Sequence, residues 1–147
     1  MKVKLLLWLI ALLLNGCAPF MQYQLEQTIA TLPSPPKDTV LLVTDKFGTG
    51  GSDCAAYTQQ NVYGSPLSIQ AIVEHYELEL SRKDWQTIHE YDLSSAEVIT
   101  FKRYENEFLG IYSKESISVE TTLSKIQVEK LATFETIYIV EMTRTCG

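Results

Sequence analysis

Three cysteines carry the most reactive side chains of the chain: Cys17, Cys54 and Cys146. A thiol can be acylated, can form a disulfide or can bind a metal, and its surroundings in the sequence indicate which. Cys17 follows an uninterrupted apolar run at residues 5–14, which is preceded by Lys2 and Lys4. A cationic start followed by about 7–15 apolar residues is typical of a secretory signal. The run is too short to span a membrane, because a spanning helix needs about 20 apolar residues.

The sequence Leu14-Asn15-Gly16-Cys17 resembles the lipobox of bacterial lipoproteins. In that family a leucine stands three residues before an invariant cysteine and a small residue directly precedes it, whereas Asn15 departs from the small or hydroxylated residue that is usual at its position. The resemblance implies that Cys17 receives a diacylglyceryl thioether and that a signal peptidase cuts before it. The new amino group then receives an acyl chain such as palmitate. Ala18 implies the outer membrane if the organism is Gram-negative, because Asp at that position favours inner-membrane retention in such lipoproteins.

The alternative is an ordinary secretory signal that a cysteine happens to follow. The ordinary signal peptidase requires small residues at the last and third-last positions before the cut. Gly16-Cys17-Ala18 is the only nearby fit, and cleavage there leaves Pro19 as the first mature residue, which that enzyme tolerates poorly. The sequence therefore favours a protein held in the cell envelope by a lipid anchor.

Cys54 and Cys146 remain as a pair in an exported protein. Disulfides persist in oxidising compartments. Neither residue has a second cysteine within a few positions, so the spacing does not match the common zinc sites. We expect a disulfide between Cys54 and Cys146, with two buried free thiols as the alternative.

Other motifs give little support for catalysis or metal binding. Gly48-Thr49-Gly50-Gly51 could be taken for a phosphate loop, but no Lys-Ser/Thr pair follows it, so a flexible loop between strands is the better interpretation. His75 and His89 are the only histidines, and neither has a partner at metal-ligand spacing. The sequence contains no Gly-x-Ser-x-Gly elbow of a serine hydrolase. We therefore assign no catalytic residue, no metal and no cofactor other than the lipid.

Carboxylates are numerous but have simpler interpretations. Glu74, Glu77 and Glu79 fit the solvated face of a helix. Glu97 and Glu107 flank an expected hairpin and can pair with Lys102 or Arg103. A two-carboxylate glycosidase stays open, because such residues need only be near each other in space.

The charge balance excludes some partners. The chain has 147 residues with 18 acidic and 12 basic side chains. Loss of the signal with Lys2 and Lys4 leaves ten basic residues, so the mature net charge is near −8. No basic stripe remains for nucleic acid. No polybasic segment follows the anchor to bind anionic lipid headgroups.

Composition divides the chain into three expected segments. Residues 1–16 are the signal peptide, residues 17–37 a lipidated N-terminus with a proline-rich tether, and residues 38–147 a single globular domain. Leu32-Pro33-Ser34-Pro35-Pro36 favours an extended polyproline spacer. Apolar residues between positions 20 and 32 suit a short helical stretch, either an interfacial contact or a frayed helix, of which we expect the frayed helix.

Apolar periodicity predicts one main helix at residues 66–81, capped by Ser65 and started by Pro66. Its apolar stripe consists of Ile69, Ile72, Val73, Tyr76 and Leu80. Strands are expected at residues 39–44, 54–60, 85–91, 97–104, 107–113 and 136–142, with a glycine-rich loop at 47–52 and an ambiguous segment at 122–133. These patterns predict an α+β fold, an antiparallel sheet of about five to six strands with the main helix packed on one face.

The segment from Tyr63-Gly64 to Trp85 also carries a resemblance. A tyrosine-glycine pair, an amphipathic helix ending in charged residues, a strand led by tryptophan and a following hairpin are similar to small exported α+β lipoproteins of bacteria. Most of these are uncharacterised, so the resemblance implies an architecture and no activity.

Together these observations favour a non-catalytic binding or assembly module that contacts another envelope protein through the open face or edge of its sheet. The alternatives are a small envelope hydrolase and a small-molecule-binding lipoprotein. A hydrolase needs a cleft in which ionisable groups of shifted pKa converge. A binding module is expected to expose an apolar patch or an unpaired strand edge.

Overall fold

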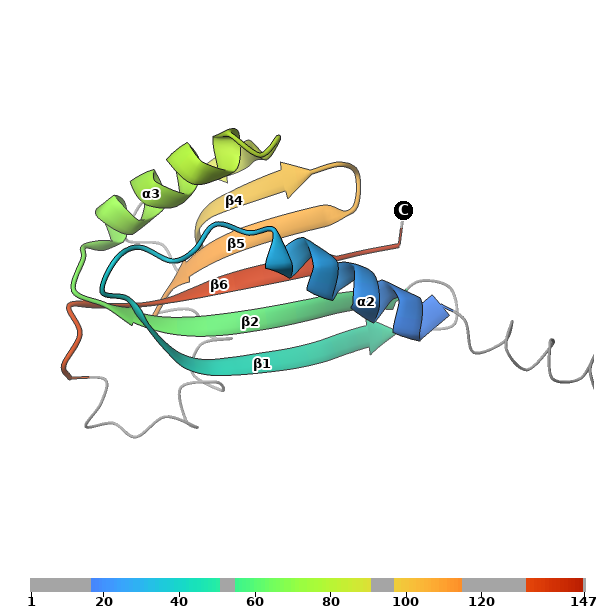
Figure 1. Ribbon diagram of the computed structural model, residues 1–147, viewed down its shortest axis with the longest axis horizontal. Helices are drawn as coiled ribbons and strands as arrows, with labels where there is room; N and C mark the ends of the chain where they lie inside the picture. Colours follow the sequence, from blue (N-terminus) through green and yellow to red (C-terminus); the bar gives the residue numbers. More distant parts are fainter. Residues whose placement is uncertain (1–16, 51–54, 91–96, 115–131, 147) are drawn as a thin grey trace, which may run out of the picture.

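The computed structural model describes residues 17–50, 55–90, 97–114 and 132–146. Within these ranges the chain forms two helices and six strands (Figure 1). In chain order they are α2 (Cys17–Ala30), β1 (Val40–Gly50), β2 (Ala55–Ser65), α3 (Ile69–Ser81), β3 (Gln86–Glu90), β4 (Glu97–Arg103), β5 (Glu107–Ser113) and β6 (Thr136–Arg144).

All six strands form one antiparallel sheet in the order β1-β2-β6-β5-β4-β3. The predicted α+β class is confirmed. The near-continuous apolar run of the last strand is explained by its place, because β6 lies between β2 and β5 and has both edges paired. Helix α3 carries the chain from β2 to the far edge at β3, from which β3, β4, β5 and β6 follow as a meander.

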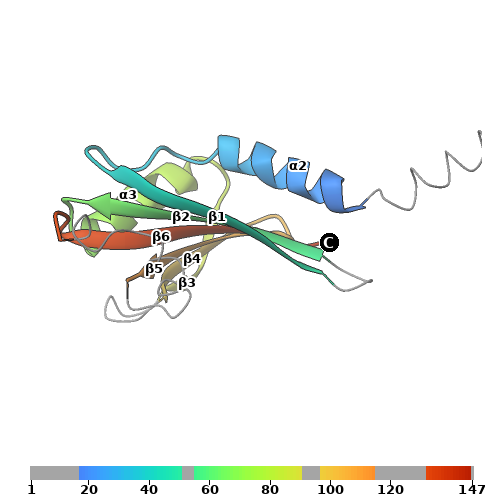
Figure 2. The ribbon, with the colours of Figure 1, turned by 90° about the horizontal axis from the view of Figure 1, so that it is seen from below.

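Both described helices contribute to a single core on one face of the sheet (Figure 2). Four residues of the predicted α3 stripe are buried, and Ile69 packs against them while partly exposed. Trp85 is buried in the same core and its amide donates to the carbonyl of Leu80, so it covers the end of α3 as expected. The cluster comprises Leu25, Ile72, Val73, Tyr76, Leu80, Trp85, Ile99, Phe101, Leu109, Ile111, Tyr138, Val140 and Met142.

The start of α3 differs from the sequence prediction. The N-cap is Ser68, whose hydroxyl accepts from the amide of Ala71 at 3.3 Å, and the helix begins at Ile69. The predicted cap, Ser65, is the last residue of β2, and its hydroxyl accepts from the amide of Leu67. Pro66 therefore lies in the connection between strand and helix. Because Ser65 is still part of β2, it cannot cap α3, and the cap is the next serine, Ser68.

The expected frayed helix and spacer are instead packed structure. Helix α2 begins at Cys17, and its Leu25 is buried in the core with Leu32 packed nearby. The proline-rich run that follows is attached to α3, because His75 bonds the carbonyl of Ser34 at 2.9 Å and Lys83 donates to the carbonyl of Thr31 at 2.6 Å. These contacts hold residues 31 and 34 against α3 and its C-terminal end, so the run is packed structure and not an extended spacer.

Strand lengths also differ from the prediction. Strand β1 continues to Gly50, so much of the predicted glycine-rich loop is paired strand, with Gly48 opposite Tyr57. The hairpin turn between β4 and β5 has three residues, 104–106, and Tyr104 takes a left-handed φ of 57°. Most of the ambiguous segment at 122–133 lies outside the described residues.

A second apolar cluster lies on the opposite face of the sheet. Val62 and Ile139 are fully buried there, beside Ile137, and the partly buried Phe134 packs against them. Gly64 belongs to the same region, since a β-carbon at Gly64 would come within 2.4 Å of the Phe134 ring. The sheet is therefore apolar on both faces at its centre.

The packing of α3 gives a direct test of the fold. We expect Ile72→Ala to lower the free energy of unfolding by about 2–5 kcal/mol, because it leaves a cavity in the main core. Leu78→Ala is the matched control on the same helix, since Leu78 is 55% exposed, and it should change stability by less than about 0.5 kcal/mol. Urea unfolding followed by circular dichroism measures both values. Equal losses would show that α3 is not packed as described.

Candidate functional site

Helix α2 brings the predicted acylation site to the folded domain. Cys17 is its first residue. The helix contacts the core through Leu25, which is buried, and Ile29, which is partly buried, and polar contacts add to this packing.

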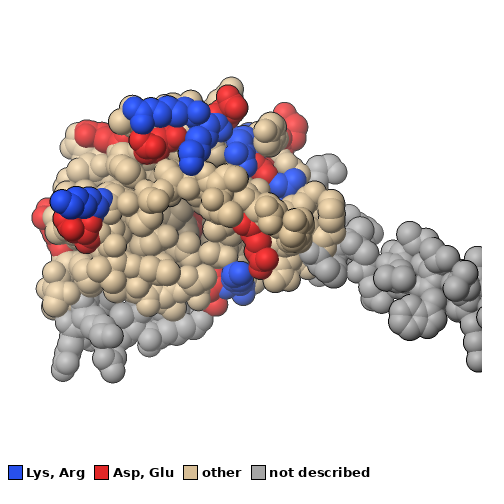
Figure 3. Space-filling model, in the orientation of Figure 1, with Lys and Arg blue, Asp and Glu red and all other residues tan. Residues whose placement is uncertain are grey.

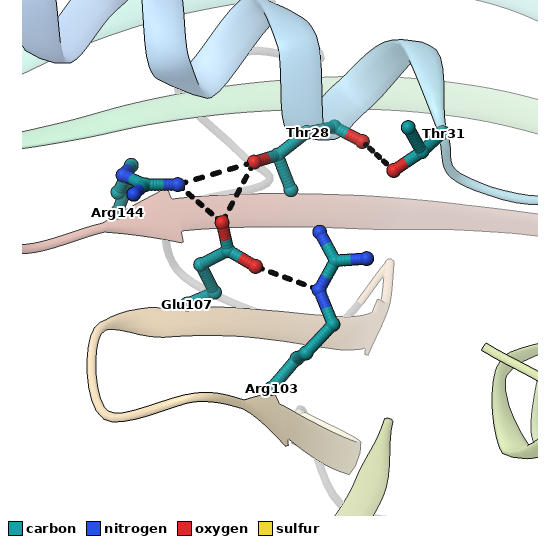
Figure 4. Close-up of polar contacts among 5 residues, drawn as sticks. All are labelled: Thr28, Thr31, Arg103, Glu107 and Arg144. Carbon is teal, nitrogen blue, oxygen red and sulfur yellow. Dashed lines mark hydrogen bonds and ion pairs between the residues drawn. The ribbon is translucent and has the colours of Figure 1, made fainter. Parts of the chain in front are cut away.

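A buried carboxylate supplies those contacts (Figure 4). Glu107 of β5 is only 2% exposed. Its Oε1 accepts from the hydroxyl of Thr28 on α2 at 2.8 Å and from Arg144 of β6, and its Oε2 accepts from Nε of Arg103 on β4 at 2.7 Å. Arg144 also donates to the Thr28 hydroxyl at 3.3 Å. We call Thr28, Arg103, Glu107 and Arg144 the Glu107 cluster.

The carboxylate of Glu107 is paired and hydrogen-bonded, whereas Nε of Arg144 is buried without a hydrogen-bond partner. A buried carboxylate is stable only when it is paired and its oxygens accept hydrogen bonds, and here both oxygens do so. The Arg103 guanidinium lies 4.9 Å from the Trp85 ring centroid, which adds a cation–π contact. The cluster thus ties α2 to three strands.

A cleft of about 220 Å³ lies between α2 and the β1–β2 hairpin. Its lining includes the apolar Leu25, the aromatic Tyr57 and the polar Gln22 and Gln59. This is below the roughly 300–1,000 Å³ of sites for drug-sized ligands. The lining residues are Gln22, Leu25, Glu26, Lys46, Phe47, Gly48, Tyr57, Thr58 and Gln59.

Two opposite charges at the cleft neutralise each other. Lys46 of β1 donates to Glu26 of α2 at 3.2 Å, and both side chains are about half exposed. The hydrogen bond and charge of Lys46, with a further hydrogen bond from Gln22, hold the pKa of Glu26 below its ordinary value. Glu26 is therefore ionised at neutral pH and is poorly suited to act as a general acid.

The remaining shifted groups are tyrosines of the core. Burial raises the pKa of Tyr63, Tyr76 and Tyr138. Tyr138 stacks on Tyr63 with ring centroids 5.4 Å apart and meets the edge of Tyr76 at 6.4 Å. All three phenols stay neutral and fill the space between α3 and the sheet.

The structure places the other sequence candidates apart. His75 lies on α3 and its ring meets the edge of Tyr76, whereas His89 is in β3 on the far edge. Glu74 is exposed on α3, and Glu79 pairs with Arg82. Cys54 lies outside the described residues.

The predicted ion pair between Glu107 and Arg103 is confirmed, but the contacts of Glu107 with Thr28 and Arg144 were not predicted. Glu107 does pair with Arg103, whereas Lys102 pairs with Glu105. Thr28 and Arg144 were missed, because they are 79 and 37 residues from Glu107 in sequence. No local pattern could connect them, since only strand order brings β5 and β6 together beneath α2.

Comparison with models of protein families, with curated proteins and with solved structures found no match. Within the described ranges, no group of three or more His, Cys, Asp or Glu side chains could hold a metal ion. The helices in those ranges are also not long and apolar enough to cross a membrane.

The Glu107 cluster can be tested by removing its carboxylate. We expect Glu107→Ala to lower the free energy of unfolding by about 3–5 kcal/mol, because two partly buried guanidiniums lose their counterion. The control is Glu105→Ala in the adjacent turn, where Glu105 is 92% exposed in its pair with Lys102, and it should cost less than about 1 kcal/mol. Chemical unfolding compares the two variants, and a small effect of Glu107→Ala would contradict the role of the cluster.

The register of β2 and β6 gives the expected disulfide a geometric basis. The paired register ends with Tyr57 opposite Arg144, three residues after Cys54 and two before Cys146 in the sequence, so the ends of β2 and β6 that lead to the two cysteines lie side by side. We predict a bridge between Cys54 and Cys146. The bridge would close a loop of about 90 residues, and in the chain-entropy model such a bridge stabilises the folded protein by about 4–5 kcal/mol. Thiol titration of the unfolded, unreduced mature protein should find no free thiol, and two free thiols would contradict the bridge.

Proposed function

We propose that this chain is a lipid-anchored, non-catalytic binding or assembly module of the bacterial cell envelope. The lipobox-like sequence before Cys17 supports the anchor, and Cys17 begins a helix that is fixed to the domain. The anchor then holds the whole sheet at the membrane surface, where an envelope protein can bind it.

The observation that carries the binding role is the exposed apolar surface of edge strand β1. Strand β1 has 11 residues and lies at one edge of the sheet that the described strands form. Val40, Leu41 and Phe47 on this strand are 49%, 52% and 43% exposed. Long edge strands with exposed apolar side chains are surfaces on which another chain adds a strand.

The cleft beside this edge supports the same role. Lys46, Phe47 and Gly48 of β1 line it, so a segment added at β1 can place one side chain there. Its size suits such a side chain better than a free ligand. The neutralised Glu26–Lys46 pair at its rim favours an uncharged group.

The hydrolase alternative receives less support from the carboxylates near α2. Glu26 has a lowered pKa and is ionised, and both oxygens of Glu107 are occupied by arginines and a hydroxyl. Glu26 is therefore poorly suited to be the protonated acid that hydrolysis of a glycoside needs, and Glu107 is not among the residues that line the cleft.

The anchor is tested by Cys17→Ser. We expect this variant to accumulate as an unprocessed precursor or to leave the membrane fraction, because firm anchoring needs two or more acyl chains. Cys146→Ser is the control, since it removes a different thiol and should remain processed and membrane-bound. Fractionation and mass spectrometry of the mature N-terminus distinguish the results. A processed, membrane-bound Cys17→Ser protein would falsify the anchor assignment.

The binding role is tested by photo-crosslinking in native membranes. A photoreactive amino acid at Phe47 should join the protein to a defined partner, and the same group at Leu78 on α3 should not. Leu41→Lys should abolish the crosslink, because lysine on an edge strand opposes strand addition. The control Leu78→Lys should leave it intact. A crosslink pattern unaffected by Leu41→Lys would contradict binding at this edge.

A further inference from the structure

The outward side of α2 presents two aromatic residues. Phe20 and Tyr23 are each 58% exposed. They are three residues apart, so they share one face of the helix. Leu25 and Thr28 are buried on the side that packs on the sheet. We call Phe20 and Tyr23 the α2 outer face.

The α2 outer face lies close to the proposed acylation site. A helix rises about 1.5 Å per residue, so Phe20 and Tyr23 follow Cys17 by about 4.5 and 9 Å along the axis. An interfacial helix buries its apolar face about 5–10 Å into the headgroup and acyl boundary. The acyl chains would therefore bring both rings to the depth at which aromatic side chains are enriched in membrane proteins.

The charge of α2 fits a lipid surface. Residues 17–25 contain no charged side chain, although the mature chain is strongly acidic. The first charged residue, Glu26, is turned toward β1 and paired with Lys46. Figure 3 shows that most charged side chains on this side of the molecule gather over α3 and at the margins, whereas the middle of the surface is largely uncharged.

The helix also has a fixed orientation. Leu25 is buried in the core, and the Thr28 hydroxyl bonds to Glu107. A frayed helix could turn any face toward the bilayer, but a docked helix can turn only its outer face. The lipid on Cys17 therefore determines which side of the sheet points toward the membrane.

We propose that the α2 outer face lies in the headgroup region of the bilayer and that α2 acts as an interfacial helix next to the lipid anchor. This inference rests on the proposed lipidation of Cys17. In this proposal lipid contacts the α2 outer face, whereas a protein partner binds at β1 and the neighbouring cleft.

Tryptophan quenching by brominated lipid tests the proposal. The full mature lipoprotein is purified from membranes as three variants, Tyr23→Trp, Gln22→Trp and Leu78→Trp, and each is placed in phosphatidylethanolamine–phosphatidylglycerol vesicles with or without bromine on the upper acyl chain. Trp85 is only 4% exposed and supplies the same background in every variant. The emission of the unsubstituted protein is subtracted.

We expect a large loss of emission for Tyr23→Trp, a smaller loss for Gln22→Trp and no loss for Leu78→Trp. Gln22 is the matched control, because it is one residue nearer to Cys17 and exposed but lines the cleft on another side of α2. Equal quenching at positions 22 and 23 would show that quenching reflects only the distance from the lipid anchor and not the side of α2, and it would overturn the proposal. A blue-shifted but unquenched Tyr23→Trp would show that protein covers the ring, in this purified system a second copy of the chain, and would also overturn the proposal.

Flotation of the same vesicles distinguishes failure of the lipid anchor from failure of the proposed orientation of α2. If the unsubstituted protein does not float, or if its mass shows no lipid on Cys17, then the anchor fails and the interfacial helix fails with it. If it floats with its lipid and Tyr23→Trp is not preferentially quenched, the anchor stands and only the orientation of α2 is wrong.

Discussion

The position of α2 depends on the buried carboxylate of Glu107. This one side chain accepts hydrogen bonds from α2, β4 and β6, and it is itself on β5 (Figure 4). A buried charge is stable only when it is paired, so the burial of Glu107 requires its hydrogen-bond partners to stay close to it. Because Thr28 is one of those partners, this requirement includes the helix that carries the proposed lipid.

This constraint changes how a lipid anchor would work. An anchor on a flexible spacer leaves a domain free to rotate, whereas an anchor at the start of a docked helix fixes the orientation of the sheet. The proposed arrangement gives the two sides of α2 different roles. Its inner side forms the cleft with β1, and its outer aromatic side meets lipid. The edge of β1 is then held at a constant height above the bilayer, which favours a partner in the same membrane.

Particular residues show where sequence reasoning succeeded. The stripe from Ile69 to Leu80 was identified correctly, because burial on one side of a helix imposes a period that short-range patterns reveal. The predicted strand at 107–113 matches β5, and the apolar run of β6 indicated a central strand. The start of α3 and the extent of β1 were wrong, because strand pairing overrode the local signals of Ser65 and the glycines.

The sequence by itself determined the class of fold and the inward face of α3, since both depend on residues close together in the chain; the location in the cell envelope is a proposal that depends on residues 5–17. Only the tertiary structure decided that residues 17–30 are a packed helix and that Thr28, Arg103, Glu107 and Arg144 meet. These contacts join residues up to 116 positions apart. They follow from strand order, which balances burial over the whole sheet and leaves no local trace in the sequence.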